Sequence, residues 1–337
     1  MTTPSGQISA LDIRNEFGET GEGKVALGSY RVSQTKGELT LAIGDGVPTS
    51  GTISYDNMRN KRLNIVVDYY SDGTISRQDQ GDNTTDARHR YNNQNDRVHV
   101  IGGLKSKPSD TSPHRVRIHV NQSIGGKSGD RNICALRTGT GWESGTSLII
   151  DVGGEGAIYG GGGAGGQGGD VDSSGHTGED GASALGIQYN GTNINVASGG
   201  LIRCGFGGGG GGGAGRQNDK GSERTVGGGG GGGGQGFPGG AGGSEGNADH
   251  GQSAGSAGDL SEAGEGGGGG NNGGEAYSGG RGEGGSQGEA ANNGSGGNHG
   301  AGSGGAEGAA IRKTAGIAFS LTNSGTVTGS TSANDVS

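Results

Sequence analysis

The sequence predicts a mainly β protein with four parts: a small α+β module over residues 1–62, a β domain over 63–150, a glycine-rich region over 151–310 and closing β strands over 311–337. Three observations lead to this prediction. Of 337 residues, 89 are glycine, and 67 of these lie in the glycine-rich region. Residues 206–310 hold only four Phe, Leu, Ile or Val side chains. β-Branched, alternating runs of residues concentrate in the β domain.

The N-terminal module is expected to hold two short helical segments. Ser9 suits the N-cap of a helix over residues 10–17, and Gly18 suits its end. The pair Ile-Ser recurs at 53–54 and again leads into a short helical turn, at 55–59. A helical pair without a special role and an attachment module both remain open at this point.

Five segments of the β domain have the β-branched or alternating pattern of strands. They are residues 63–70, 97–101, 115–120, 133–136 and 147–152. Residues 78–96 are polar and charged throughout, which predicts a long exposed loop.

A strand–turn–strand unit recurs along the chain. Its copies lie at residues 148–160, 194–205 and 319–329. The first two copies run straight into glycine tracts, so the units are expected to form a base on which the tracts are mounted.

The glycine tracts cannot be ordered by a side-chain core. Four large apolar residues do not offset the conformational entropy of about a hundred residues. The tracts 207–213 and 227–234 are pure glycine. This favours polyglycine II helices packed side by side, in which backbone N–H and C=O groups pair between neighbours and every third position can carry a side chain. A flexible linker is the alternative.

Polar segments between the tracts are the candidate binding sites. If the tracts are antiparallel rods, these segments gather at the rod ends and form a binding surface. Amide, basic and aromatic side chains there suit the recognition of a sugar or a protein loop, although simple solvated connections are the alternative. The candidate receptor-binding residues are Arg216, Asn218, Lys220, Arg224, Asp249, His250, Asn271, Tyr277, Arg281 and His299.

Composition excludes several classes of protein. Five prolines are too few for collagen. The glycine-rich region has seventeen acidic and five basic residues, which argues against nucleic acid as a partner. The chain lacks an apolar run long enough for membrane insertion. Cys134 and Cys204 are expected to be buried thiols.

Motifs for catalysis and for metal binding fail on inspection. Residues 121–128 end in Gly-Lys-Ser, but Asn121 stands where a phosphate-binding loop requires glycine. Residues 165–173 approach a calcium-binding nonapeptide, but Asp172 occupies the apolar position and the unit does not repeat. We therefore expect no enzymatic activity, no metal and no cofactor.

The chain resembles fibre proteins of tailed bacteriophages, particularly the glycine-rich distal adhesins of T-even-like phages. The resemblance rests on the tracts, on the strings at residues 8–18 and 46–54, which are similar to modules that open many phage structural proteins including those of cyanophages, and on the closing string at 314–329. It implies a virion protein with an N-terminal attachment domain and a polyglycine II bundle bearing host-recognising loops.

The resemblance also implies the partners. Other virion tail or fibre proteins would bind through residues 1–150, and a host cell-surface glycan or protein would bind the loops; a homotrimer stays open. Two other functions remain as alternatives. One is an architectural virion component, such as a decoration or connecting fibre, without receptor binding. The other is a secreted ice- or carbohydrate-binding protein, against which the missing signal peptide counts.

Overall fold

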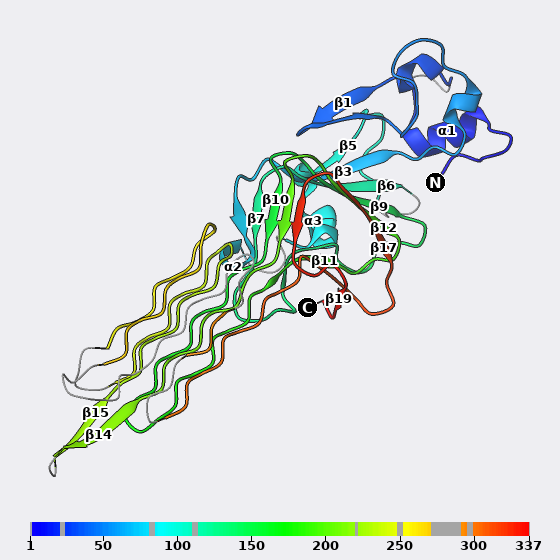
Figure 1. Cartoon of the computed structure of the whole chain (residues 1–337). Coiled ribbons are helices and arrows are strands. Elements are labelled where there is room, and N and C mark those ends of the chain that lie inside the picture. Colours follow the sequence, from blue (N-terminus) through cyan, green and yellow to red (C-terminus); the bar gives the residue numbers. More distant parts are fainter. Residues whose placement is uncertain are drawn as a thin grey trace.

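The protein is elongated, with the N-terminal module at one end, a β body in the middle and a bundle of extended tracts that ends in a hairpin at the other end (Figure 1). The structure is a computed structural model, and it describes residues 2–20, 24–80, 85–109, 114–219, 222–247, 252–270, 291–294 and 299–336.

The N-terminal module contains the predicted helix. Helix α1 spans Ala10–Phe17, the Ser9 side chain accepts the Asp12 N–H at 3.2 Å, and Gly18 ends the helix at φ 101°. The second Ile-Ser pair leads into a short 3₁₀ helix, as the repeated pattern predicted. The remaining elements are η1 (Leu27–Tyr30), β1 (Ser33–Lys36), β2 (Leu39–Ala42) and η2 (Tyr55–Met58).

The β body is a parallel solenoid with three faces. The first sheet contains β3 (Asn64–Tyr69), β6 (Arg115–Val120), β9 (Ser147–Val152), β12 (Thr192–Val196) and β17 (Phe319–Asn323), with β5 (Val98–Val100) antiparallel to β3. The second sheet contains β4 (Ile75–Ser76), β7 (Ser123–Gly125), β10 (Ala157–Tyr159), β13 (Leu201–Arg203) and β18 (Thr326–Thr328). The third sheet contains β8 (Cys134–Arg137), β11 (Ser183–Ile187), β16 (Ile311–Lys313) and β19 (Ala333–Asn334).

The recurrent strand–turn–strand unit is the first two sides of a solenoid coil. The three predicted copies are β9–β10, β12–β13 and β17–β18, and they stack in parallel on one another. A further copy, β6–β7, stacks below them. The prediction that these units form a base is confirmed, because the tracts leave the solenoid after β10 and after β13 and return at β11 and β16.

Stacked coils align their apolar side chains in rows inside the solenoid. One row runs through Val67, Ile118, Ile150, Ile194 and Leu321, which are register partners on successive strands. The first four of these side chains are fully buried. Burying each one stabilises the fold by roughly 1.5–3 kcal/mol, so this body has an ordinary side-chain core.

The prediction of an exposed loop over residues 78–96 is wrong. The segment contains most of helix α2 (Arg77–Gln80), helix α3 (Ala87–Asn93) and the beginning of the 3₁₀ helix η3 (Asn95–Arg97). Asp86 caps α3 by accepting the His89 N–H at 2.9 Å. The sequence misled because Arg90, a charged residue, is buried: its guanidinium lies 3.8 Å from the centre of the Tyr69 ring.

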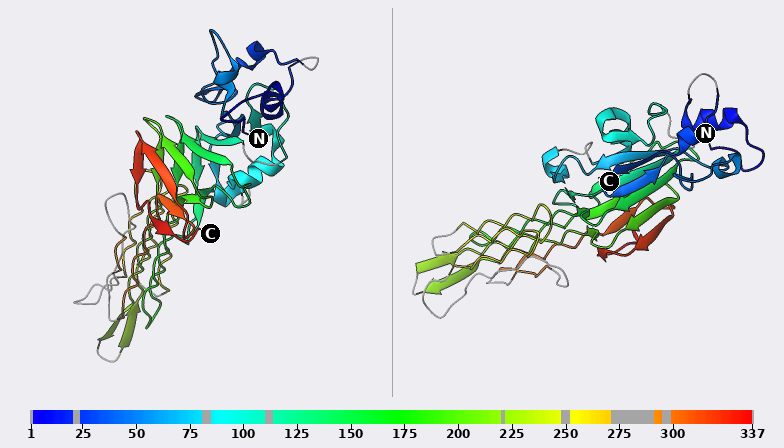
Figure 2. Two further views of the ribbon diagram at one scale, coloured as in Figure 1. Left: turned by 90° about the vertical axis from the view of Figure 1, so that its right-hand side faces the viewer. Right: turned by 90° about the horizontal axis from the view of Figure 1, so that it is seen from above.

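Glycine tracts run side by side away from the solenoid (Figures 1 and 2). Neighbouring tracts exchange backbone hydrogen bonds at every third residue: Gly163, Gly166 and Gly169 donate to the carbonyls of Phe206, Gly209 and Gly212, each at 2.8 Å. Outward tracts span residues 160–169, 205–214, 238–247 and 262–270, and returning tracts span 175–182, 227–236, 252–259 and 299–309.

The number of glycines per triplet follows the number of neighbouring tracts. A Cβ on Gly228, Gly229 or Gly230 would lie 1.9–2.1 Å from the carbonyl oxygens of three different tracts. The tract 227–234 is pure glycine because it is enclosed on all three sides. In the outer tract 175–182, glycine recurs only at the third position that faces residues 205–211, and the other positions carry side chains.

Candidate functional site

Described ends of the tracts gather at the end of the bundle that lies farthest from the N-terminal module. There the Asn247 N–H donates to the Asp170 carboxylate at 2.6 Å, and the His299 N–H donates to the Ala214 carbonyl at 3.2 Å. The Gly270 N–H donates to the Gly227 carbonyl at 3.1 Å. Four outward tracts therefore end close to one another, and we call this end the distal tip.

A two-stranded hairpin forms the most distant part of the distal tip (Figure 1). Strands β14 (Gly215–Asp219) and β15 (Ser222–Val226) pair antiparallel, with Arg216 opposite Thr225 and Asn218 opposite Glu223. The predicted candidates Arg216, Asn218 and Arg224 thus lie on paired strands rather than in an irregular loop.

Most of the other predicted candidates lie outside the described residues. These are Lys220, Asp249, His250, Asn271, Tyr277 and Arg281. His299 is described: its Nε2 atom lies 3.5 Å from an oxygen of Asp172, which ties the start of the last returning tract to the first turn of the bundle.

Sequence reasoning missed that first turn, residues 170–174. Val171 is 44% exposed there, and Asp172 adopts a left-handed conformation with φ 60°. Through Asp170 the turn also contacts Asn247, the described end of a neighbouring tract. The sequence signal for this turn is the change from repeated Gly-Gly-X triplets to Asp-Val-Asp-Ser-Ser.

At the other end, buried and half-buried polar contacts fix the N-terminal module to the solenoid. Arg117 lies 2.9 Å from Asp45 of the module and 2.8 Å from Asp151 of the solenoid. Glu16 accepts the Leu63 N–H at 2.6 Å. Burial disfavours the charged form of Asp45, but Arg117, a hydrogen bond from Asn64 and Arg115 outweigh it and hold the pKa of Asp45 below its usual value.

The module also leaves two large hydrophobic side chains in solvent. Leu11 is 62% exposed and Tyr55 is 39% exposed, and they lie in α1 and at the start of η2, the two segments that follow the Ile-Ser pairs. The two related segments therefore each present an apolar side chain outward.

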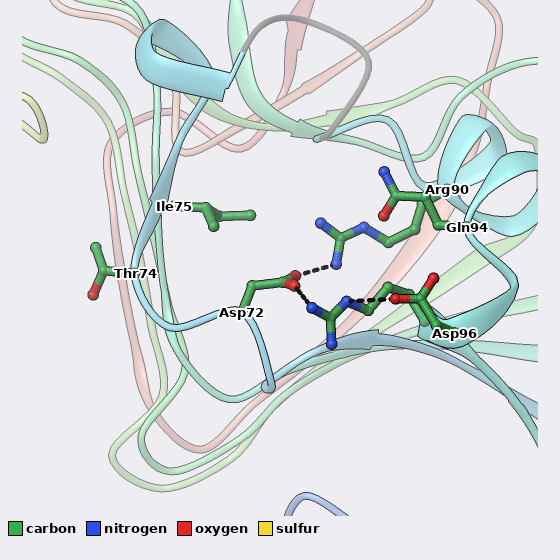
Figure 3. A pocket seen from close by; sticks show the side chains of 7 residues that line it. Asp72, Thr74, Ile75, Arg90, Gln94 and Asp96 are labelled. Carbon is green, nitrogen blue, oxygen red and sulfur yellow. Dashed lines mark hydrogen bonds and ion pairs between the residues drawn. The ribbon is translucent and has the colours of Figure 1, made fainter.

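A cavity of about 410 Å³ lies between the β3–β4 connection and α3 (Figure 3). Asp72 pairs with both Arg90 and Arg97 across 2.5 Å, and Asp96 lies 3.7 Å from Arg97, so two carboxylates balance two guanidinium groups. Because Arg90 is also stacked on Tyr69, we interpret the cluster as the clamp that holds α3 on the solenoid.

The described residues contain no group of three His, Cys, Asp or Glu side chains arranged to hold a metal ion. Within the same part of the chain, none of the helices has the length and apolar character needed to cross a membrane. Cys134 and Cys204 are buried free thiols, as predicted, and burial raises the pKa of each to about 12.

A β solenoid from which a bundle of glycine tracts projects has the architecture of a fibrous structural protein. The family model described as phage tail fibre adhesin Gp38 matches residues 83–332. The chain therefore belongs to this family, and it is a phage tail fibre adhesin and a structural component of the virion.

Among solved structures, the chain is similar to the gp37–gp38 adhesin tip complex of the bacteriophage S16 long tail fibre. The two share 15% sequence identity over 97% of this chain and 98% of that one, with a TM-score of 0.37. No curated protein matches the sequence.

Proposed function

We propose that this adhesin recognises a host cell-surface glycan or protein through its distal tip and joins other tail fibre proteins through residues 1–150. The observation that carries the proposal is the separation of the two ends: the described tract ends and the β14–β15 hairpin lie at the distal tip, and the module with exposed Leu11 and Tyr55 lies at the opposite end. A receptor-binding surface has to point away from the fibre that carries it.

In this proposal the tracts are polyglycine II helices that act as rigid struts. Hydrogen bonds at every third residue and carbonyl groups too close to accept a Cβ support this assignment. Hydrogen exchange followed by mass spectrometry tests it in the whole chain. Amides of residues 207–213 and 227–234 are expected to exchange slowly, and exchange at random-coil rates would favour a flexible linker.

Receptor recognition is tested by exchanging the distal segments 216–225 and 271–281 for those of a related adhesin with a different host range. The exchanged protein should lose binding to the original host cells while its melting temperature stays unchanged. Ser320→Ala, an exposed change on the solenoid, is the matched control and should bind normally. Full cell binding by the exchanged protein would favour an architectural role instead.

Attachment is tested at the other end with Leu11→Asp and Tyr55→Asp. Loss of these exposed apolar contacts should remove the adhesin from assembled virions without affecting cell binding by the purified protein. Normal incorporation of both variants would place the attachment surface elsewhere in residues 1–150.

Sedimentation of the purified chain tests whether the protein forms a homotrimer.

A further inference from the structure

A groove of about 330 Å³ lies on the outward face of the first sheet, beside the β1–β2 hairpin. Hairpin residues Glu38 and Leu39 line one side of it. The Glu38 carboxylate accepts the Gly154 N–H at 2.8 Å, so the hairpin reaches the end of β9. On the next two strands of the sheet, β12 and β17, the outward-facing residues Asn193, Ser320 and Thr322 are exposed.

A lateral row of polar side chains forms the floor of the groove. Asp151, Asn195 and Thr322 are register partners on adjacent strands. With strands about 4.8 Å apart, the row spans about 10 Å. The Asn195 side-chain N–H donates to the Asp151 carboxylate at 2.9 Å, so the carbonyl oxygen of the same amide points away from that carboxylate. Ser324 adds a second hydroxyl group at the far end.

We propose that this groove binds a neutral saccharide. A bound peptide strand would need unpaired backbone groups, but β9 and β12 are each paired on both sides and offer the groove only their side chains. The row of Thr322, Asn195 and Asp151, on three adjacent strands, supplies hydroxyl, amide and carboxylate groups, which match the alternating donors and acceptors of sugar hydroxyls. The half-buried Leu39 gives an apolar surface for the C–H face of a ring.

Charge in the groove selects against acidic sugars. The Asp151 carboxylate is compensated by Arg117 at 2.8 Å. For Glu38, the described part of the chain places no cation within ion-pair distance. An unpaired carboxylate at the rim repels a uronate or a phosphate-bearing sugar and tolerates an uncharged one. This site is separate from the distal tip and goes beyond receptor recognition there.

Saturation-transfer NMR with the full chain tests the proposal, using glucose, galactose, N-acetylglucosamine and glucuronate as probes. At least one neutral sugar should receive saturation, and glucuronate should give a signal at least tenfold weaker. Asn195→Ala and Thr322→Val should each reduce the signal at least fivefold. Ser320→Ala, on the same exposed face of β17 but outside the groove lining, is the matched control and should leave the signal unchanged.

Two further measurements separate this site from the distal tip and from misfolding. The variant with exchanged distal segments should keep the saccharide signal even where it loses cell binding. In ¹⁵N-labelled wild-type protein, the Asn195 side-chain amide resonance should shift on titration with the sugar. The proposal is overturned if no neutral sugar receives saturation, if glucuronate binds equally well, if Asn195→Ala keeps the signal, if the distal exchange abolishes it, or if the amide resonance stays still.

Discussion

The solenoid and the glycine bundle exclude water from their interiors in opposite ways. Inside the solenoid, rows such as Ile118, Ile150 and Ile194 fill the space between the sheets with side chains. Inside the bundle, backbone packs on backbone, and the position of Gly231 has a neighbouring carbonyl oxygen 2.0 Å from where a Cβ would be. The solenoid is stabilised by burial of apolar side chains, and the bundle is stabilised by backbone hydrogen bonds between neighbouring glycine tracts.

The two regions therefore respond to opposite kinds of substitution. A solenoid core loses stability when carbon atoms are removed, because a cavity remains. The bundle loses stability when a single carbon is added, because its nearest neighbours are backbone atoms that cannot move independently.

Gly231→Ala should have the largest effect. Its Cβ would lie 2.0 Å from the Gly209 carbonyl oxygen and 2.7 Å from the Gly209 carbonyl carbon. We expect the free energy of unfolding of the bundle to fall by more than about 4 kcal/mol. Circular dichroism melting of the variant should show early loss of the bundle while the solenoid signal persists. A variant with the wild-type melting curve would mean that the tract is not enclosed.

Ile150→Ala should destabilise the solenoid by about 3 kcal/mol, because Ile150 is fully buried in the central row and leaves a cavity. Urea denaturation followed by tryptophan fluorescence measures this, since Trp142 is buried in the same core. Ile150→Val is the matched control and should cost about 1 kcal/mol. Equal losses for the two variants would argue against a tightly packed interior.

Sequence alone predicted regular strands of the solenoid and the helix of the N-terminal module. Strands β6 and β9 have the predicted bounds, because β6 alternates Val and Ile with polar residues and β9 is rich in β-branched side chains. Ser9 and Gly18 fixed the ends of α1 through capping. The recurrent unit revealed three coils, although β7 is so short that its segment was considered only as a phosphate loop.

Tertiary contacts hid the rest. Residues 78–96 contain a buried arginine whose partners Tyr69 and Asp72 come from β3 and the β3–β4 connection, so polarity wrongly suggested an exposed loop. Of the distal tip, the sequence predicted that polar segments gather, but not that Arg216 and Asn218 lie on a hairpin. The turn at Asp170 was not predicted, because the contact that involves it is a hydrogen bond with Asn247, which lies far along the chain.

Acid should weaken the contact between the N-terminal module and the solenoid, and it should leave the backbone contacts of the bundle unaffected. The pKa of Asp45 lies below its usual value in the folded protein, so its contribution is present above pH 3.8 and is lost as the pH falls through the folded pKa. Asp45→Asn should cost up to about 1 kcal/mol at pH 7, since the carboxylate is half-exposed. The difference in unfolding midpoint between the wild type and the variant should narrow as the pH falls below 3.8. A difference that stays constant as the pH is lowered would exclude this carboxylate as its source.

Gln167→Ala should have the smallest effect, although its neighbour Gly166 is among the least tolerant positions. Gly166 faces the returning tract, where a Cβ would lie 2.0 Å from the His176 carbonyl oxygen. Gln167 occupies the third position of the same triplet and already carries a side chain, which is half-buried. We expect Gln167→Ala to change the free energy of unfolding by less than about 0.5 kcal/mol. Gly166→Ala should destabilise the bundle by more than about 4 kcal/mol in the same melting experiment. If the two adjacent variants melted alike, the period of three that connects backbone hydrogen bonding to side-chain tolerance would not describe the bundle.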